Sequence, residues 1–499
     1  MLYESTRGKY RSVTSAEAIK AGIAPDGGLF VPATRPGIDL GKLHKMTSMN
    51  YNERAFAVLQ HFLTDYSDDE IKDCINNAYN MDKFDSPEIA PVKELSQGIY
   101  TLELWHGPTC AFKDMALQIL PHLLTRAAAK TGEKSEIVIL VATSGDTGKA
   151  ALEGFKDVPG TRIVVFYPQE GVSEVQKLQM ITQEGKNVNV IAVDGNFDDT
   201  QTGVKEIFGD QGINSELQTN GYRFSSANSI NWGRLVPQIV YYFSAYFDLL
   251  SQGKIERGEA INFVVPTGNF GNILAGYYAR AMGLPIHKLV CAANENNVLT
   301  EFIRTGIYDR NRGFKRTISP SMDILISSNL ERLLYEITEH NAEAVNEWME
   351  TLKEKGWYEV EPGIRDAIDN IFWSEYATDR ETMQTIKDTF NQHNYLMDTH
   401  TAVGKNVYDK YVLATQDKTK TVIVSTASPF KFNASVARAV LKEEEIAGQS
   451  EFELLDVLAQ ASGMAIPEGL KNLDQKPLLH TTTVPKEEMP GAVKEGLGI

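Results

Sequence analysis

Short apolar runs that alternate with amphipathic helical stretches are the feature that most constrains the fold of this chain. The runs lie at residues 136–142, 162–168, 188–195, 260–266 and 420–427, and a stretch with helical periodicity follows each of them. Strands that are apolar on both faces are typical of parallel sheets covered by helices on both sides. The sequence therefore predicts an α/β fold with parallel or mixed sheets.

The order of these patterns suggests how the chain divides. A chain of 499 residues is too long for one ordinary core. Residues 1–95 show few strand signals and predict an N-terminal module, and residues 131–235 predict a small α/β domain. Residues 96–130 and 236–499 predict a large α/β domain with a mostly helical insertion at about 300–400. The insertion shows its strongest helical pattern at 329–356.

Charge and cysteine content exclude several classes of protein. The net charge of −17 argues against nucleic acid and anionic membranes as general partners, although a local pocket can still be positive. Cys74, Cys110 and Cys291 are far apart and show no C-x-x-C spacing, which argues against a disulfide framework or a zinc site. We therefore expect no metal. Because no apolar signal core or membrane-spanning run is present, we expect a cytoplasmic protein.

Ligands of open α/β sheets bind at the carboxyl ends of the strands, so the loops there are candidate sites. The loop at 142–150 resembles a P-loop, but Thr143 stands where that pattern needs glycine and Ala150 where it needs Ser or Thr. It remains suited to a carboxylate or phosphate at a helix N-terminus. An ordinary helix cap by Ser144 or Asp146 is the alternative.

Three further loops carry anion-binding chemistry. Residues 264–272 hold glycines in a G-x-x-G arrangement, which does not indicate NAD but suits a phosphate, with a plain turn as the alternative. Residues 425–435 offer hydroxyls and Lys431, which by themselves are turn chemistry. Residues 225–243 carry a polar cluster that ends in Arg234. Such clusters are more often caps, although the arginine suits a phosphate ester.

One lysine stands out beside these loops. Lys113 follows the turn-forming residues 106–109 and opens a helix with an apolar face. Four anion-binding loops and one such amine fit pyridoxal phosphate (PLP), which forms a Schiff base with lysine and acts as an electron sink. A surface lysine with its stem on apolar residues is the other interpretation, and these residues alone leave both open.

Eight motifs, in order along nearly the whole chain, are together highly specific. They are YESTRG (3–8), GIAPDGGLFVP (22–32), HGPTCAFKD (106–114), TSGDTG (143–148), NSINWGR (228–234), PTGNFGN (266–272), DTHTAVG (398–404) and STASPFKF (425–432). In this order they resemble the threonine synthase family, of the longer type found in bacteria and fungi. That family belongs to the fold type II PLP enzymes, whose fold is like that of the tryptophan synthase β subunit. One departure is Ser428, where a histidine is common.

The resemblance implies roles for particular residues. Lys113 carries the cofactor and acts as the general base, and Thr426 lies at the pyridine nitrogen. The phosphate of the cofactor is assigned to Gly268, Asn269, Phe270, Gly271 and Asn272. Asp146 lies beside the phenolic oxygen, and the same loop holds the substrate carboxylate through Thr143, Ser144, Gly145 and Thr147. We add the hypothesis that the substrate phosphate is bound by Asn228, Ser229, Asn231, Arg234 and Lys431.

The implied activity is that of a lyase in threonine biosynthesis. It converts O-phospho-L-homoserine and water to L-threonine and phosphate, in a monomer or homodimer. A PLP-dependent phospho-lyase or dehydratase is a rival, and a non-catalytic regulatory protein is a more distant one. We expect Asp114 to serve the helix dipole. His106 and His400 could orient the substrate or simply be satisfied polar residues, and we treat neither as catalytic.

Overall fold

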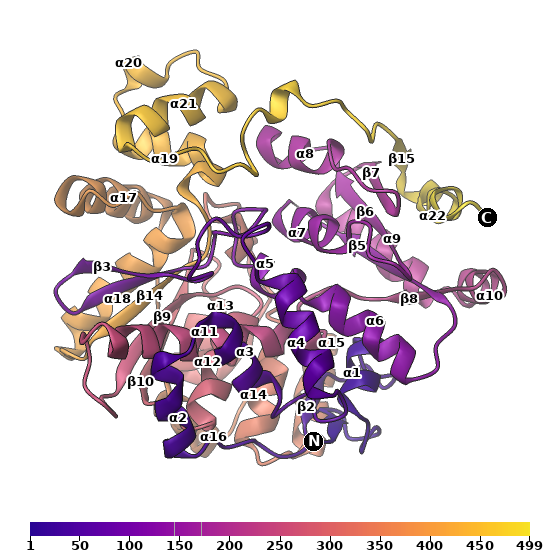
Figure 1. Cartoon of the computed structure of the whole chain (residues 1–499), viewed down its shortest axis with the longest axis horizontal. Helices are drawn as coiled ribbons and strands as arrows, with labels where there is room; N and C mark the ends of the chain where they lie inside the picture. The colour runs from indigo at the N-terminus through magenta and orange to yellow at the C-terminus, as the bar shows by residue number, and fades with distance from the viewer. Residues whose placement is uncertain (144, 171) are drawn as a thin grey trace.

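Two sheets organise the molecule (Figure 1). The computed structural model describes residues 1–143, 145–170 and 172–499. The larger sheet has six strands, of which five are parallel and β3 is an antiparallel edge. In spatial order they are β13 (Phe372–Tyr376), β10 (Ile286–Ala293), β9 (Ile261–Pro266), β14 (Thr421–Ser425), β4 (Ile99–Glu103) and β3 (Val92–Ser96).

The smaller sheet has five strands, all parallel. In spatial order they are β15 (Thr483–Pro485), β7 (Val188–Asp194), β6 (Thr161–Pro168), β5 (Glu136–Ala142) and β8 (Tyr222–Ser225). The alternation of side chains along β5 shows why it is apolar throughout. Ile137 and Ile139 face the main core, whereas Val138 and Leu140 face a separate cluster on the other side of the sheet.

Helices of the first half of the chain build the N-terminal module and cover the smaller sheet. They are α1 (Ser15–Ala21), α2 (Leu40–Lys45), η1 (Met46–Ser48), α3 (Tyr51–Leu59), α4 (Asp68–Ala78), α5 (Asp114–Leu117), α6 (Leu120–Lys130), α7 (Asp146–Phe155), α8 (Glu174–Ile181), α9 (Phe197–Gly209) and α10 (Gln211–Thr219). The N-terminal module also contains the antiparallel pair β1 (Tyr3–Ser5) and β2 (Phe30–Pro32).

Most helices of the second half surround the larger sheet, whereas the last one packs on the smaller sheet. They are α11 (Trp232–Ser251), α12 (Gly271–Ala281), α13 (Val298–Thr305), η2 (Pro320–Met322), α14 (Leu330–Ile337), α15 (Ala342–Lys355), α16 (Pro362–Asp369), α17 (Asp379–His393), α18 (Thr399–Thr415), η3 (Pro429–Phe432), α19 (Asn433–Val440), α20 (Glu443–Ile446), α21 (Glu451–Ser462), η4 (Leu473–Gln475), η5 (Lys486–Glu488) and α22 (Met489–Leu497). A second antiparallel pair joins β11 (Ile307–Asp309) to β12 (Trp357–Glu359).

The long helix α11 is the centre of the main apolar core. It is buried over most of its length and packs against α3 and α12, so that it connects the N-terminal module with the larger sheet. The same cluster of apolar side chains reaches Ile139 on β5 and Phe263 on β9. The two sheets therefore share one continuous core.

The predicted α/β architecture is confirmed, since each of the five apolar runs forms a parallel strand followed by a helix. Two short elements differ from the sequence-based expectation. Within the predicted helical insertion, β13 forms an edge of the larger sheet. The C-terminal strand β15 pairs with β7 of the smaller sheet, although residues from 236 onward were assigned to the large domain. Strands of three to five residues carry too little periodicity to be assigned to a sheet from sequence.

Candidate active site

Lys113 is placed at the junction between the two sheets by its immediate neighbours. It precedes α5, and the backbone N–H of Phe112 donates to the carbonyl of Thr426 at 2.8 Å, at the carboxyl end of β14. The Asp114 carboxylate accepts from the backbone N–H (2.8 Å) and hydroxyl (2.7 Å) of Thr109, which closes the preceding turn. With its side chain only 11% exposed, Lys113 is buried and is not a surface lysine.

The amine of Lys113 has two polar neighbours. Its Nζ lies 3.2 Å from Ser321 Oγ and 3.5 Å from Asp146 Oδ2. Burial lowers the pKa of Lys113, Asp146 opposes the shift, and Lys431 and Arg234 lower the pKa further. A lowered pKa increases the neutral fraction of the amine, which is the form that attacks carbonyl carbons and accepts protons.

Asp146, the first residue of α7, carries the negative charge of the site. Its Oδ1 lies 3.1 Å from Lys431 Nζ and accepts a hydrogen bond of 2.8 Å from Gln176 Nε2. Burial alone would raise the pKa of Asp146, but Lys431 and Lys113 lower it well below its usual range. The carboxylate is therefore ionised between two lysines.

Lys431 holds the neighbouring segments together. Its side chain is completely buried in η3 and donates to the carbonyl of Thr109 at 2.7 Å, beside its ion pair with Asp146. Ser428 caps the same short helix, since its hydroxyl accepts from the N–H of Phe430 at 3.4 Å. The residue where the family often has histidine thus serves as a cap here.

The glycine loop after β9 has its carbonyl groups engaged by neighbouring segments. The carbonyl of Gly268 accepts from Ser327 Oγ at 2.8 Å, and that of Asn269 accepts from Asn329 Nδ2 at 2.9 Å. Phe270 adopts a left-handed φ of 63° just before α12, whose first-turn N–H groups have no intrahelical acceptors. A Cβ on Gly268 would lie 2.6 Å from the Ser321 carbonyl oxygen, so only glycine fits. This loop can receive an anion.

An unsatisfied amide lies at the start of α12. The Oδ1 of Asn272 accepts from the hydroxyls of Tyr241 (2.6 Å) and Tyr242 (2.8 Å), and its buried Nδ2 has no partner among the described residues. Buried donors without an acceptor cost free energy. A bound oxyanion at this loop would satisfy Asn272 Nδ2, so the residues fit the predicted phosphate.

Arg234 offers a second unsatisfied donor. It is 4% exposed in α11, donates through Nη1 to the carbonyl of Ala227, and has no partner for Nε within the described part of the chain. Burial lowers the pKa of Arg234 to about 10, which leaves it charged at neutral pH. A buried guanidinium with a free donor is suited to bind an oxyanion of a substrate.

One predicted ligand residue uses both ends of its side chain in hydrogen bonds within the fold. Asn231 caps α11, with Nδ2 donating to the carbonyls of Ile19 (3.0 Å) and Ser226 (2.9 Å) and Oδ1 accepting from the N–H of Gly233 (2.9 Å). We therefore leave Asn231 out of the proposed substrate site. Asn228 and Ser229 lie half-buried in the turn just before this cap.

The loop after β5, which is predicted to bind the substrate carboxylate, is fixed by hydrogen bonds to the side chain of Thr143. The Thr143 hydroxyl accepts from the N–H groups of Gly145 (3.0 Å) and Gly148 (2.9 Å), so it fixes the loop and is not free for a ligand. Thr147 is half-buried in the first turn of α7. Ser144 lies outside the described residues.

Sequence reasoning missed Ser321 as a site residue, whereas it named His400 as a residue that could orient the substrate. Ser321 lies in η2 and contacts both Lys113 and Asp146. His400 Nε2 accepts from the Ser321 N–H at 3.1 Å, and its Nδ1 lies 2.7 Å from Asp398 Oδ2. The only sequence signal for His400 was its place in the motif DTHTAVG (398–404). Ser321 lies in the helical insertion, where no motif marks it.

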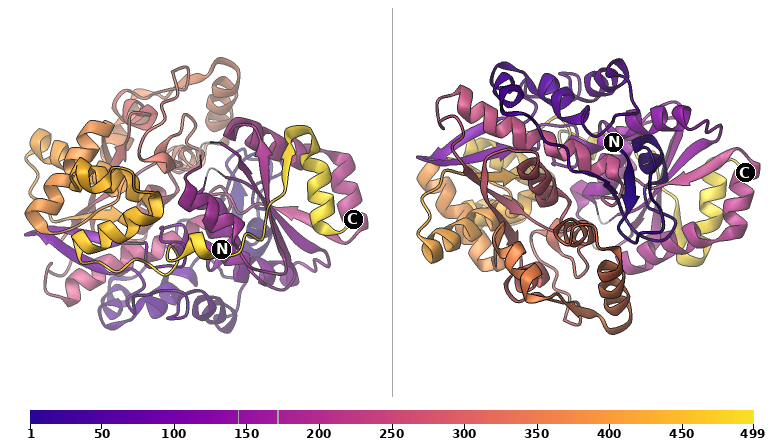
Figure 2. Two further views of the ribbon diagram at one scale, coloured as in Figure 1. Left: turned by 90° about the horizontal axis from the view of Figure 1, so that it is seen from above. Right: turned by 90° about the horizontal axis from the view of Figure 1, so that it is seen from below.

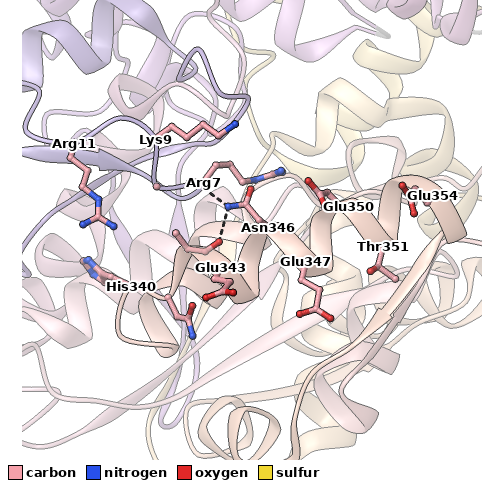
Figure 3. A pocket seen from close by; sticks show the side chains of 13 residues that line it. Arg7, Lys9, Arg11, His340, Glu343, Asn346, Glu347, Glu350, Thr351 and Glu354 are labelled. Atoms are coloured by element: carbon pink, nitrogen blue, oxygen red, sulfur yellow. Dashed lines mark hydrogen bonds between the residues drawn. The ribbon is translucent and has the colours of Figure 1, made fainter.

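His106 lies apart from this cluster, and so does a surface groove at the N-terminal module. His106 is held between Asp85 (2.5 Å) and Glu103 (3.0 Å) and makes no contact with Lys113. A groove of about 850 Å³ runs between residues 7–11 and α15, with basic residues on one side and glutamates on the other (Figure 3). It contains none of the predicted site residues. Among the described residues, no group of side chains could hold a metal ion, and no helix is long and apolar enough to cross a membrane.

Comparison with known proteins identifies the family. A family model described as pyridoxal-phosphate dependent enzyme matches residues 83–428, and models described as threonine synthase N terminus and threonine synthase, C-terminal match residues 2–79 and 401–495. Threonine synthase of Saccharomyces cerevisiae is 38% identical over 467 residues, covering 88% of this chain and 89% of the relative. Threonine synthase-like 1 of Homo sapiens is 41% identical over 449 residues, covering 88% of this chain but 59% of the relative.

Solved structures agree with this assignment. The yeast threonine synthase matches with a TM-score of 0.88 and 35% identity, covering 100% of this chain and 99% of the other. The PLP-bound threonine synthase from Brucella melitensis matches with a TM-score of 0.87 and 35% identity, covering 99% of each chain. The predicted fold type II architecture is confirmed. The chain belongs to the threonine synthase family of pyridoxal-phosphate-dependent enzymes.

Proposed function

We propose that this chain is a threonine synthase that converts O-phospho-L-homoserine and water to L-threonine and phosphate, with pyridoxal 5′-phosphate as its cofactor. The observation that carries the proposal is the buried amine of Lys113, whose pKa is lowered and which lies within 3.5 Å of Asp146. The proposed enzyme acts as a monomer or homodimer. A cytoplasmic location is supported by three buried and unpaired cysteines, which fit a reducing compartment.

The cofactor would be held by groups from four segments that follow strands. Lys113 would bind its aldehyde, and the loop from Gly268 to Asn272 would bind its phosphate through backbone N–H groups and Asn272 Nδ2. Thr426, beside the Lys113 segment, would face the ring nitrogen, and Asp146 the phenolic oxygen. When bound, the cofactor supplies an electron sink for negative charge that develops on the substrate.

Lys113 would then move the protons of the reaction. Its neutral amine would take the proton from the substrate Cα and deliver it to the electron sink that the cofactor supplies. Neutral again, the amine would take a proton from Cβ, so that phosphate leaves from Cγ. The protonated amine would return its proton to Cγ, which makes Cβ electrophilic for the attacking water. The first proton would then return to Cα, and the proton that the water loses would leave with the phosphate. A buried amine with a lowered pKa suits this repeated exchange, because burial weakens its hold on a proton.

The charge of the site suits a doubly anionic substrate. Lys113 and Lys431 flank the carboxylate of Asp146, and Arg234 lies near enough to lower the pKa of Lys113, so cations outnumber this carboxylate in a chain whose net charge is −17. The N–H groups at the start of α7 would bind the substrate carboxylate. Arg234, with its free Nε, would bind the substrate phosphate together with Asn228, Ser229 and Lys431.

A second candidate is a phospho-lyase that releases phosphate without adding water at Cβ. The chain is 41% identical to a protein named threonine synthase-like 1, a name that differs from threonine synthase. This similarity supports the phospho-lyase as a second candidate. Lys113 and the anion-binding groups would serve both reactions. Only the fate of the carbon skeleton separates them.

A paired product assay tests both candidates. The purified chain with added pyridoxal phosphate is incubated with O-phosphohomoserine, and released phosphate and amino-acid product are measured together. We expect equal amounts of phosphate and threonine. Phosphate accompanied by a keto acid would establish the phospho-lyase, and absence of both products would remove this substrate.

The variant Lys113→Ala is the matching control for the assigned lysine. It should lose the visible absorbance band of the bound cofactor and all turnover while keeping the far-ultraviolet circular dichroism of the native chain. A scaffold without catalytic function would show no such band in the native chain.

A further inference from the structure

The hydroxyl of Ser321 contacts both members of a long ion pair in the site. Ser321 Oγ is 3.2 Å from Lys113 Nζ and 3.2 Å from Asp146 Oδ2, while Nζ and Oδ2 are 3.5 Å apart. The amine donates to the hydroxyl and the hydroxyl donates to the carboxylate. A neutral donor thus occupies Oδ2, whereas Lys431 and Gln176 occupy Oδ1.

The turn that carries Ser321 is fixed from two sides. Its backbone N–H donates to His400 Nε2, which therefore carries no proton, and Asp398 accepts from the opposite ring nitrogen. On the other side, Asn294 Nδ2 and Thr317 Oγ1 each donate to the Asp323 carboxylate at 2.7 Å. The position of the Ser321 hydroxyl is therefore set by the fold and not by a flexible side chain alone.

We propose that Ser321 is a further catalytic residue, whose hydroxyl occupies Asp146 Oδ2, opposes a closer ion pair between Lys113 and Asp146, and so favours the reactive, neutral amine. His400 is a positioning residue that acts through Ser321. The inference rests on the proposed function only in taking Lys113 as the reacting amine.

The charges around Lys113 give the direction of the effect. Burial lowers the pKa of Lys113, Lys431 from η3 and Arg234 from α11 lower it further, and Asp146 from α7 raises it. Without the Ser321 hydroxyl, Oδ2 loses its neutral donor, and the amine at 3.5 Å is the nearest replacement. The attraction between opposite charges grows as the distance falls, so removal of the hydroxyl should increase the proton affinity of Lys113.

Chemical labelling of the full chain, freed of pyridoxal phosphate, tests this directly. Acetic anhydride is applied over a series of pH values, and acetylation of Lys113 is followed by peptide mass spectrometry. In Ser321→Ala we expect the midpoint of the labelling profile to rise by about one pH unit, equivalent to labelling about tenfold slower at neutral pH. His400→Ala should shift the midpoint in the same direction by less.

Two controls test whether the shift in midpoint comes from the Ser321 hydroxyl acting on Asp146. Ser215→Ala removes an exposed hydroxyl on helix α10 that donates to the Gln211 carbonyl and does not touch Lys113, so its midpoint should equal that of the native chain. Asp146→Asn removes the charge, so adding Ser321→Ala to it should cause no further rise.

A pair of variants of similar shape covers the case in which Ser321→Ala does not fold. Ser321→Thr keeps a hydroxyl and should retain the native midpoint, whereas Ser321→Val should raise it. An unchanged or lowered midpoint in Ser321→Val, or in a folded Ser321→Ala, would overturn the proposal. Labelling requires no turnover, so this result is independent of the product assay.

Discussion

The three cations of the site, Lys113, Lys431 and Arg234, differ in how many partners each one has. Lys431 is completely buried and has two short contacts, to Asp146 and to the Thr109 carbonyl. Lys113 has only longer contacts of 3.2 and 3.5 Å, and Arg234 keeps a donor without a partner in the described part of the chain. Lys431, whose contacts are short, holds the site together. Lys113 and Arg234, with long contacts or a donor without a partner among the described residues, can react or bind a ligand.

Arg234 provides a test of the substrate phosphate site. Arg234→Gln removes the positive charge, and a charge-assisted hydrogen bond to an oxyanion contributes about 1.5–3 kcal/mol, so we expect KM for O-phosphohomoserine to rise by about 10- to 100-fold. Inhibition by inorganic phosphate should weaken in parallel. Arg223→Gln, at an exposed ion pair with Glu133, should change neither quantity. An unchanged KM in Arg234→Gln would place the phosphate elsewhere.

His106 links stability to pH. Burial lowers its pKa, but hydrogen bonds to Asp85 and Glu103 prevail and raise the pKa of His106 to about 9. The folded value exceeds the unfolded value of about 6.5, so the stabilisation is complete below that pH and is lost as the pH rises through the folded value.

The variant His106→Gln tests this linkage. It should be less stable than the native chain by about 2 kcal/mol at pH 6, allowing for the exposure of Asp85, and the difference should largely disappear by about pH 10. Urea denaturation at several pH values measures it. His393→Gln, at an exposed position, should show no such trend. A difference that is constant with pH would mean that the ring is not protonated in the folded chain.

At the scale of elements, the contact between α5 and α7 sets the distance across the site. Lys113 precedes α5 and Asp146 begins α7, so any displacement of one helix moves the two side chains apart. Gly154, on α7, lies so close to the Leu117 carbonyl of α5 that a Cβ there would overlap it. The glycine therefore determines how closely the two helices approach.

Gly154→Ala should consequently affect both stability and catalysis. We expect a loss of about 1–3 kcal/mol in the free energy of unfolding, as for an overpacked core, together with a lowered kcat. Gly209→Ala, at the end of α9 with no atom near the added methyl group, is the matched control and should behave like the native chain. Unchanged kcat in Gly154→Ala would show that the helices can separate without disturbing Lys113 and Asp146.

The elements and residues that sequence reasoning found share one physical property, which is a strong local signal. β5 and β9 are apolar on both faces, and the rule that ligands bind at strand ends led to Asp146 and Gly268. Asn231 shows the limit of that rule, because a side chain that caps a helix and one that binds a ligand look alike in sequence. Ser321 reaches the site through contacts distant in the chain, which no local pattern shows.

At the scale of the whole molecule, the chain crosses between the two sheets more than once. After β14, helices α19 to α21 lie on the side of the larger sheet, and the chain then runs to the smaller sheet (Figure 2). There the Ala192 N–H of β7 donates to the Thr482 carbonyl at 2.9 Å, and Asn189 Nδ2 donates to the Gly496 carbonyl at 2.9 Å. The last strand and helix thus cover an edge of the sheet that carries Asp146.

The C-terminal helix α22 should therefore stabilise the smaller sheet selectively. Val493 is completely buried in the apolar cluster that α22 shares with β5, β6 and β7. Val493→Asp places an unpaired carboxylate there, which costs several kcal/mol, so hydrogen exchange should accelerate in β5 to β7.

Exchange in β9, β10 and β14 should change less in the same variant, because these strands pack in other clusters. Leu413→Asp is the control, since Leu413 is 77% exposed on α18 and should tolerate the charge. Equal acceleration in both sheets would show that the shared core around α11 makes the molecule unfold as one cooperative unit. Acceleration confined to the smaller sheet would show that the half carrying Asp146 can open while the half carrying Lys113 stays folded.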